Sequence, residues 1–188
     1  MNMSIDANAP DSEGVVSSYE MMFGSGTHIA RSVRVDLMCL MASTLTNVLI
    51  HFVFSTKRRD DLIRLECETD LKAYVGGLCR TRDSPLLAMG GTANHVHMVV
   101  ALHKTISVSD LMRDVKRESC LWLKERSDPR FQWQDGYFAH SVSPGDIEVL
   151  FRYIAIQKEH HRRRDFKDEV RAMCRKYGLD LNEKFAWD

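Results

Sequence analysis

Two histidines, His95 and His97, stand one residue apart in the apolar stretch ANHVHMVVAL. In a β-strand, residues i and i+2 point to the same face, so both imidazoles would project from one side with their Cα atoms about 7 Å apart. Neutral imidazoles bind divalent metals such as Zn, Mn, Fe, Co and Ni, so the pair could share one ion. Two ligands make a weak site, and His-x-His also arises by chance, so a third group is needed from another element.

We expect that third group in the stretch LFRYIAIQKEHH. Apolar residues from Ile147 to Ile154 follow an i, i+3, i+4, i+7 pattern and predict the buried stripe of a helix. Tyr153 lies beside this stripe, and Gln157 follows one turn later on the same side, so both can project into one site. A tyrosine hydroxyl close to a metal could act as a nucleophile. A helix-edge tyrosine with a solvated hydroxyl gives the same pattern, and Tyr137 is the rival for the nucleophile's role.

Basic residues gather in three segments, each next to one of these candidate site elements. Such runs are usually solvated surface, but in this setting they also fit contacts to nucleic-acid phosphates. The formal net charge is zero, with 26 basic and 26 acidic residues, so total charge gives no support and the case depends on local clustering. The candidate DNA-binding residues are Lys57, Arg58, Arg59, Arg113, Lys116, Arg117, Lys124, Lys158, Arg162, Arg163 and Arg164.

Periodicity and turn residues predict the elements that must position these groups. β-branched and aromatic residues predict strands over 47–56, 84–91, 93–102 and 136–143. Helical spacing predicts helices over 60–83, 106–126, 143–161 and 167–177. The third helix would begin at an N-cap, Ser143, with a capping-box-like Asp146, and the last would end before Gly178. The order β-α-β-β-α-β predicts an α+β, ferredoxin-like or RRM-like antiparallel sheet with helices packed on one face, followed by a C-terminal tyrosine-bearing helix.

The first forty residues differ in composition from the rest of the chain. They are rich in Ser, Gly, Asn and Asp and lack sustained periodicity, so we expect residues 1–40 to be a disordered extension and residues 41–188 to be the functional domain. Five scattered cysteines indicate reduced thiols rather than a disulfide framework. With neither a signal peptide nor an apolar run long enough to span a membrane, the sequence predicts a cytoplasmic protein.

Taken together, these segments resemble the single-tyrosine HUH transposases of bacterial insertion sequences and their REP-associated tyrosine transposase relatives. HUH denotes histidine, a bulky apolar residue and histidine, here His95, Val96 and His97. IHFVFSTKRR is similar to the family's first strand, GGTANHVHMVV to its HUH strand, and YIAIQKEHHRRRDF to the segment around its tyrosine. The resemblance runs from about Met41 to the C-terminus, and the joint occurrence in this order is more specific than any single motif.

The resemblance implies a DNA transposase that cleaves and transfers single-stranded DNA. Tyr153 would attack a phosphodiester and form a 5′-phosphotyrosine, while His95, His97 and Gln157 would hold a divalent metal, Mg or Mn. It further implies recognition of DNA hairpins at the element ends, and a homodimer whose active sites are composed across subunits. From this resemblance we expect a bacterial protein that is cytoplasmic and is associated with the nucleoid when bound to DNA.

Two positions depart from the family's pattern: Asn94 stands where Asp is frequent, and Ile156 where Asn is frequent. Neither removes a proposed ligand or the nucleophile. Two alternatives stay open, a domesticated REP-associated enzyme of the same chemistry and a catalytically silent nucleic-acid-binding module on the same kind of sheet. Another HUH enzyme, such as a replication initiator or relaxase, fits less well with the small size and with a tyrosine helix after the HUH strand.

Overall fold

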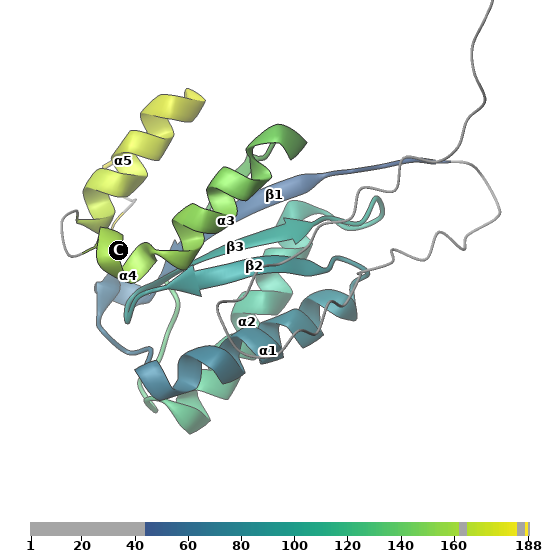
Figure 1. The fold of residues 1–188 in the computed structure, drawn as a ribbon. Coiled ribbons are helices and arrows are strands. Elements are labelled where there is room, and N and C mark those ends of the chain that lie inside the picture. The colour runs from purple at the N-terminus through teal and green to yellow at the C-terminus, as the bar shows by residue number, and fades with distance from the viewer. Residues whose placement is uncertain (1–43, 162–164, 184–186, 188) are drawn as a thin grey trace, which may run out of the picture. The chain divides into compact units, whose positions relative to one another are not determined.

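A computed structural model describes residues 44–161, 165–183 and 187, and a four-stranded antiparallel sheet lies at its centre (Figure 1). The strand order is β2-β3-β1-β4, so the histidine-bearing strand is central in the sheet. The predicted extension of residues 1–40 lies outside the described residues. The strands are β1 (Leu49–Ser55), β2 (Leu86–Gly91), β3 (His95–Ala101) and β4 (Phe138–Ser141). The α-helices are α1 (Glu68–Arg80), α2 (Val108–Arg126), α3 (Ile147–Ala155), α4 (Gln157–His160) and α5 (Phe166–Tyr177).

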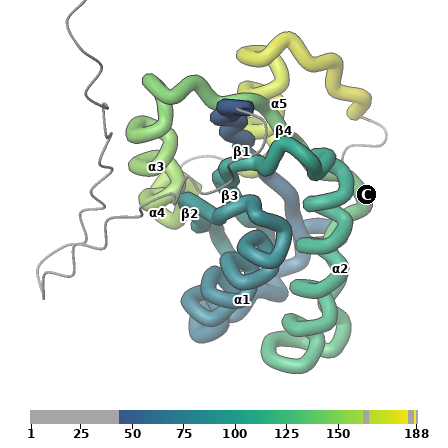
Figure 2. The backbone as a smooth tube through the Cα atoms, turned by 90° about the vertical axis from the view of Figure 1, so that its right-hand side faces the viewer, coloured from purple at the N-terminus to yellow at the C-terminus, as the bar shows by residue number. Residues whose placement is uncertain are grey.

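One face of the sheet is apolar and is covered by α1 and α2 (Figure 2). Alternate residues of β1 and β3, such as Phe52 and Met98, point to this face and are fully buried. They pack against the apolar stripes of the two helices, which include Val75 and Leu111. The α2 stripe begins where Ser107 caps the helix by accepting a hydrogen bond from the Asp110 backbone N–H at 3.0 Å. The β-α-β-β-α-β order and the helices on this face confirm the predicted fold.

The other face of the sheet is covered by α3 and α5 (Figure 1). Ile147 and Ile154 of α3 pack on Leu49 and Val99, and α5 packs on Val53 through a second small apolar cluster. His95 and His97 point to this face, because they share the parity of Val99 along β3. The histidine pair is therefore enclosed between the sheet and the C-terminal helices.

The predicted single helix over 143–161 is wrong, because the structure divides it. Ser143 caps a short 3₁₀ turn, Pro144–Asp146, and no side chain caps the start of α3, so the predicted role of Asp146 is not seen. At Ile156 the backbone leaves helical geometry (φ −101°, ψ 15°) before α4 begins. The predicted last helix is confirmed as α5, which ends at Gly178 in the left-handed conformation (φ 64°) that glycine adopts without strain.

Gly90 of β2 allows α3 to approach the sheet closely. It is the register partner of His97 on β3, so it lies beside that histidine on the same face. A Cβ atom on Gly90 would lie 2.6 Å from the carbonyl oxygen of Ile154. The missing side chain thus brings the end of α3, and with it Tyr153, toward His97.

Candidate active site

His95 is a fully buried residue at the start of β3, and its ring orientation is set by its neighbours. Its Nδ1 lies 2.8 Å from Thr92 Oγ1 and 2.8 Å from Asn94 Oδ1. Asn94 is itself held by Asp61, whose carboxylate accepts a hydrogen bond from Asn94 Nδ2 at 2.8 Å. Because an amide oxygen can only accept, Nδ1 of His95 carries the proton that it donates to Asn94, and Nε2 keeps its lone pair. Asn94, one of the departures from the family pattern, therefore orients the histidine.

His97 is also fully buried, two residues further along the strand. The His95 and His97 ring centroids are 5.3 Å apart. Nδ1 of His97 lies 3.1 Å from Nε2 of His51, and its Nε2 lies 3.4 Å from a carboxylate oxygen of Glu169. Both histidines thus turn Nε2 toward the space between the sheet and α5.

The predicted tyrosine and glutamine come to the same place within this one chain. The Tyr153 ring centroid lies 5.8 Å from that of His97, and the half-buried tyrosine donates its hydroxyl hydrogen to Glu169. Gln157 is 1% exposed, and its Nε2 lies 3.5 Å from the same carboxylate. The predicted constellation of Tyr153, His95, His97 and Gln157 is therefore brought together.

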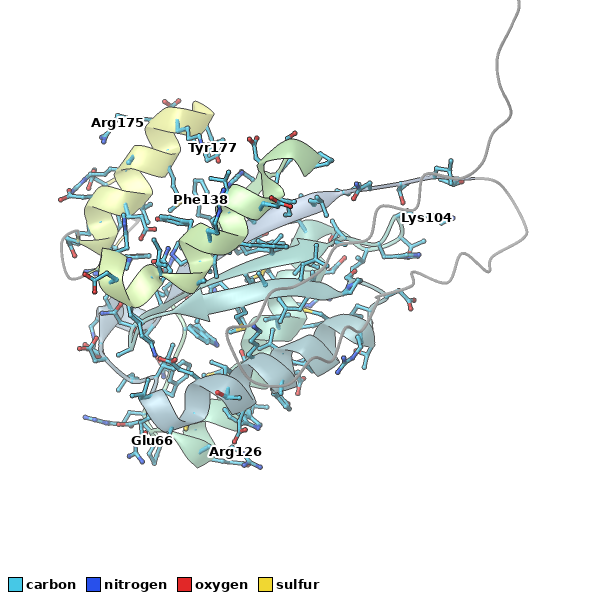
Figure 3. All side chains as sticks on the ribbon, viewed as in Figure 1. Glu66, Lys104, Arg126, Phe138, Arg175 and Tyr177 are labelled. Atoms are coloured by element: carbon cyan, nitrogen blue, oxygen red, sulfur yellow. The ribbon has the colours of Figure 1, made fainter. Side chains whose placement is uncertain are left out.

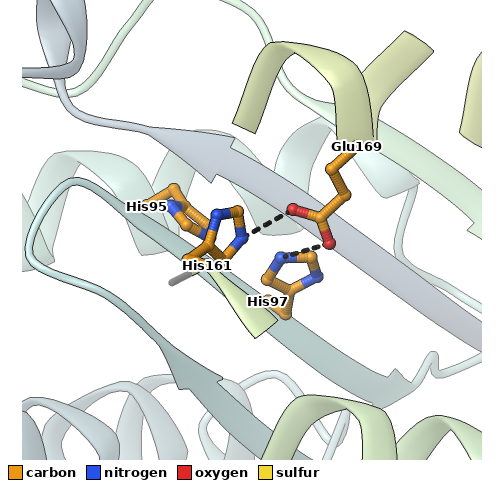
Figure 4. A group of neighbouring side chains, drawn as sticks. All are labelled: His95, His97, His161 and Glu169. Atoms are coloured by element: carbon orange, nitrogen blue, oxygen red, sulfur yellow. Dashed lines mark ion pairs between the residues drawn. The ribbon is translucent and has the colours of Figure 1, made fainter. Parts of the chain in front are cut away.

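Two further residues complete the cluster, and we did not predict them from the sequence. His161 and Glu169 join His95 and His97 in a group whose potential ligand atoms all lie within 4.8 Å of one another (Figure 4). His161 Nε2 lies 2.8 Å from Glu169 Oε2. A signal for Glu169 does exist, since it occupies the apolar stripe of α5 between Phe166 and Val170, where a carboxylate needs a polar partner.

Burial determines the protonation states in this cluster. Burial first, and neighbouring imidazoles second, lower the pKa of His95 to about 2 and that of His97 to about 3, so both rings are neutral at physiological pH. Burial also raises the pKa of Glu169 to about 8. Neutral imidazoles are the form that binds metals.

The cluster has the composition and the unsatisfied atoms expected of a metal site. Nε2 of His95, Nε2 of His97 and Oε1 of Gln157 are buried and have no hydrogen-bond partner among the described residues. Buried polar atoms normally have a partner, and several together suggest an absent ligand. Imidazole nitrogens together with a carboxylate or an amide oxygen suit a divalent transition metal such as Mn²⁺. These residues could therefore hold a metal ion.

A comparison with models of known protein families shows which family this chain belongs to. The model of the family described as "Transposase IS200 like" matches residues 44–157, which is more than half of the chain and includes both histidines, Tyr153 and Gln157. The chain belongs to the IS200-like transposase family. The resemblance inferred from the sequence is confirmed.

Two curated proteins and two solved structures are similar to this chain. The chain is 27% identical over 129 residues to the transposase of insertion sequence element IS200 from Salmonella typhimurium LT2 and equally to that from Salmonella typhi, covering 65% of this chain and 84% of each relative. A transposase candidate from Deinococcus radiodurans R1 has the same fold, with a TM-score of 0.51, 18% identity and coverage of 64% of this chain and 98% of that one. A REP-associated tyrosine transposase bound to a REP hairpin gives a TM-score of 0.49, 18% identity and coverage of 64% and 72%.

Among the residues that the structure describes, the other tyrosines of this IS200-like transposase have ring contacts away from His95 and His97. Tyr137, the predicted rival, lies 6.1 Å from Phe52, which belongs to the apolar face. Tyr74 stacks on Trp122. Tyr153 is the described tyrosine whose ring contacts His97, which favours it as the nucleophile.

The basic cluster after β1 lies close to the histidine pair. Ser55, the last residue of β1, is the register partner of His95, and the turn Lys57–Arg59 follows at once. The Lys57 and Arg58 side chains are exposed. Arg59 donates to the carbonyl oxygen of Trp187 at 3.0 Å, so part of its guanidinium is already engaged.

Several basic residues of α2 make internal contacts. Lys116 Nζ donates to the backbone carbonyl oxygens of Gln134, Asp135 and Gly136 and so anchors that loop. Arg113 and Arg117 form ion pairs with acidic residues of their own helix, and Lys158 pairs with Glu68 at 2.6 Å. Lys124 is half-buried, and Arg162, Arg163 and Arg164 lie outside the described residues. Lys116 therefore has a structural role, and the DNA contacts of the remaining residues stay predictions.

None of the described helices combines the length and the apolar composition that crossing a membrane requires.

Proposed function

We propose that this transposase cleaves and rejoins single-stranded DNA through Tyr153. The observation that carries the proposal is the convergence of Tyr153, the His95–His97 pair and Glu169 in one cluster of a chain that belongs to a transposase family. A tyrosine alone, or a histidine pair alone, would be weaker support for DNA cleavage. Together they supply a nucleophile, a group that can accept its proton and a place for a cation.

In the proposed step, Tyr153 Oη attacks the phosphorus of a phosphodiester. A tyrosine O–P bond forms, the bond between phosphorus and the 3′ oxygen breaks, and the products are a 5′-phosphotyrosine and a 3′-OH that takes its proton from water. Tyr153 donates a hydrogen bond to Glu169, whose pKa burial raises to about 8, and in its ionised form this carboxylate can accept the phenolic proton. The half-buried position of Tyr153 leaves part of the side chain accessible to a strand.

The metal site would act on the phosphate. His95 and His97 would hold Mg²⁺ or Mn²⁺ together with Gln157, His161 or Glu169, and the bound ion would polarise the phosphate and stabilise the negative charge that develops on it. The chain's own contribution is to keep both histidines neutral, with Nε2 of each directed at the site. Because the tyrosine–phosphate linkage retains the energy of the broken bond, attack by a 3′-OH would reverse the step without ATP.

DNA hairpins at the element ends are the proposed substrates, as the family resemblance implies. The exposed Lys57 and Arg58, directly after β1, are well placed to contact phosphates of a strand that reaches Tyr153. A homodimer is part of the same proposal. The resemblance implies sites composed across two subunits, whereas in the structure one chain supplies both the histidines and the tyrosine.

A covalent adduct assay tests the proposal. The full chain is incubated with Mn²⁺ and labelled single-stranded DNA from the flanks of its own gene, and products are separated on a denaturing gel. We expect a protein–DNA adduct that disappears in Tyr153→Phe and with EDTA. The matched control is Tyr137→Phe, which removes a hydroxyl on the opposite side of the sheet and should form the adduct normally. An adduct that persists in Tyr153→Phe would refute the assignment, and a folded protein that binds the DNA but forms no adduct would favour the silent module.

A further inference from the structure

Three histidines from three adjacent strands form a hydrogen-bonded row that ends at the metal site. His140 of β4 and His51 of β1 are register partners, and His51 is a diagonal neighbour of His97 on β3. His140 Nε2 lies 3.0 Å from His51 Nδ1, and His51 Nε2 lies 3.1 Å from His97 Nδ1. We call His140, His51 and His97 the histidine row.

A backbone carbonyl fixes the direction of every hydrogen bond in this row. His140 Nδ1 lies 2.9 Å from the carbonyl oxygen of Ser141, which can only accept, so Nδ1 of His140 carries a proton. A neutral His140 then offers the lone pair of Nε2 to a proton on His51 Nδ1. The neutral His51 in turn offers the lone pair of Nε2 to a proton on His97 Nδ1. His97 is left with an unprotonated Nε2.

We propose that His51 and His140 are positioning residues that hold His97 in its Nδ1–H tautomer and so keep His97 Nε2 available for the cation of the proposed function. The other tautomer would place a hydrogen on Nε2, between the ring and Glu169, and would remove the lone pair that binds a metal. Partners of this kind orient metal-binding histidines in many proteins and raise their basicity. The inference rests on the metal site in the proposed function.

The surroundings of His51 argue against a packing role. It is 1% exposed, and its neighbours on the same face of β1 are the buried apolar residues Leu49 and Val53. An apolar side chain would fill this position without the cost of burying two ring nitrogens. Packing therefore does not explain a histidine here, whereas its two hydrogen bonds to His97 and His140 do.

Helix α5 holds both ends of the histidine row. Glu169 meets His97 at one end, and at the other Tyr177 stacks on His140 with ring centroids 3.8 Å apart. Tyr177 lies beside Phe138 of β4, which supports the same edge (Figure 3). The aromatic stack covers one side of the His140 ring and limits its rotation, so the row is anchored by packing as well as by the Ser141 carbonyl.

The test measures the tautomer and the metal affinity without DNA. Long-range ¹H–¹⁵N spectra of the full-length, metal-free chain report which ring nitrogen of His97 is protonated, and Mn²⁺ titration gives the affinity. We expect the Nδ1–H tautomer in the unmodified chain. In His51→Phe we expect a mixture of tautomers and Mn²⁺ affinity lowered by about 10- to 100-fold. In His140→Phe, which keeps an aromatic ring under Tyr177, the loss should be smaller, about two- to fivefold.

The rescue variant is His51→Gln, whose amide oxygen can still accept from His97 Nδ1–H. It should retain the tautomer and most of the affinity, which a purely structural role for His51 would not predict. An Nε2–H tautomer of His97 in the unmodified chain would overturn the inference. So would unchanged affinity in a folded His51→Phe, with folding checked by circular dichroism. If the unmodified chain bound no Mn²⁺, the proposed metal site would fail, while the tautomer measurement would still decide the histidine row.

Discussion

Phe52 and Met98 face α1 and α2, whereas His51 and His97, on the same two strands, face α3 and α5. The first face is a continuous apolar core. The second buries three imidazoles, of His51, His95 and His97, together with Gln157 and Glu169, and the desolvation of these groups opposes folding unless hydrogen bonds or a cation compensate. One sheet thus separates the apolar core that stabilises the fold from the face to which we assign the proposed chemistry. Substitutions on the two faces should therefore have different signatures.

The largest expected effect on the second face is on metal affinity. His95→Ala removes one of the two Nε2 atoms directed at the site, so we expect Mn²⁺ affinity to fall by at least about 100-fold, more than for loss of an orienting partner. Calorimetric titration measures this. His103→Ala is the matched control, because His103 bonds Thr105 in the loop after β3 and should bind Mn²⁺ normally. Equal affinity in both variants would contradict the metal site.

On the apolar face the expected effect is on stability alone. Leu111 is fully buried in the α1–α2 core, and Leu111→Ala should lower the free energy of unfolding by about 3 kcal/mol, through lost apolar burial and the cavity left behind. Urea denaturation measures the loss. Mn²⁺ affinity of the folded variant should be unchanged, and a large drop in affinity would show that the two faces are not separable.

Glu169 gives the second face a distinct pH dependence. Its pKa is raised from 4.5 to about 8 by burial, so between these values the folded chain keeps a proton that the unfolded chain has lost. Its contribution to stability is therefore fully present below pH 4.5 and is lost as the pH rises toward 8. Relative to Glu169→Gln, the unmodified chain in EDTA should lose on the order of 3 kcal/mol between pH 5 and pH 8. Parallel urea titrations at the two pH values measure the difference, and a pH-independent difference would mean that the carboxyl is ionised throughout.

The smallest expected effect concerns Gly90, the glycine whose missing side chain allows α3 to approach the sheet. A methyl group at Gly90 would collide with the Ile154 carbonyl, so Gly90→Ala should destabilise the chain by about 2 kcal/mol and reduce adduct formation by moving Tyr153. Gly77→Ala is the control, since a Cβ atom at this position of α1 would meet nothing within 4 Å and alanine favours helix by up to about 1 kcal/mol. Thermal unfolding and the adduct assay compare the two. Normal adduct formation in Gly90→Ala would show that α3 can shift without moving the tyrosine.

Local patterns in the sequence determined much of the fold. The alternation in HVHMVVA placed both histidines on one face of a central strand, and the order of strands and helices predicted the sheet. These features depend on neighbours two to four residues apart, which a sequence displays directly. The shared side of Tyr153 and Gln157 is another such local feature, since one helical turn of four residues separates them. It survived even though the predicted helix breaks at Ile156.

Only the tertiary structure decided what surrounds the histidine pair. His51 meets His140 across 89 residues of sequence, and Glu169 reaches Tyr153 from a separate helix. The contacts of Lys116 were likewise decided only by the tertiary structure. Its sequence context fits a phosphate contact, but its ammonium group donates to the backbone carbonyl oxygens of the loop before β4. A sequence shows which side chains are charged or polar, but their partners are set by how strands register and how helices dock. The positions of Tyr153 and of the histidine pair could therefore be predicted, while the groups that orient them emerged from the packing of α5 and β4 against the sheet.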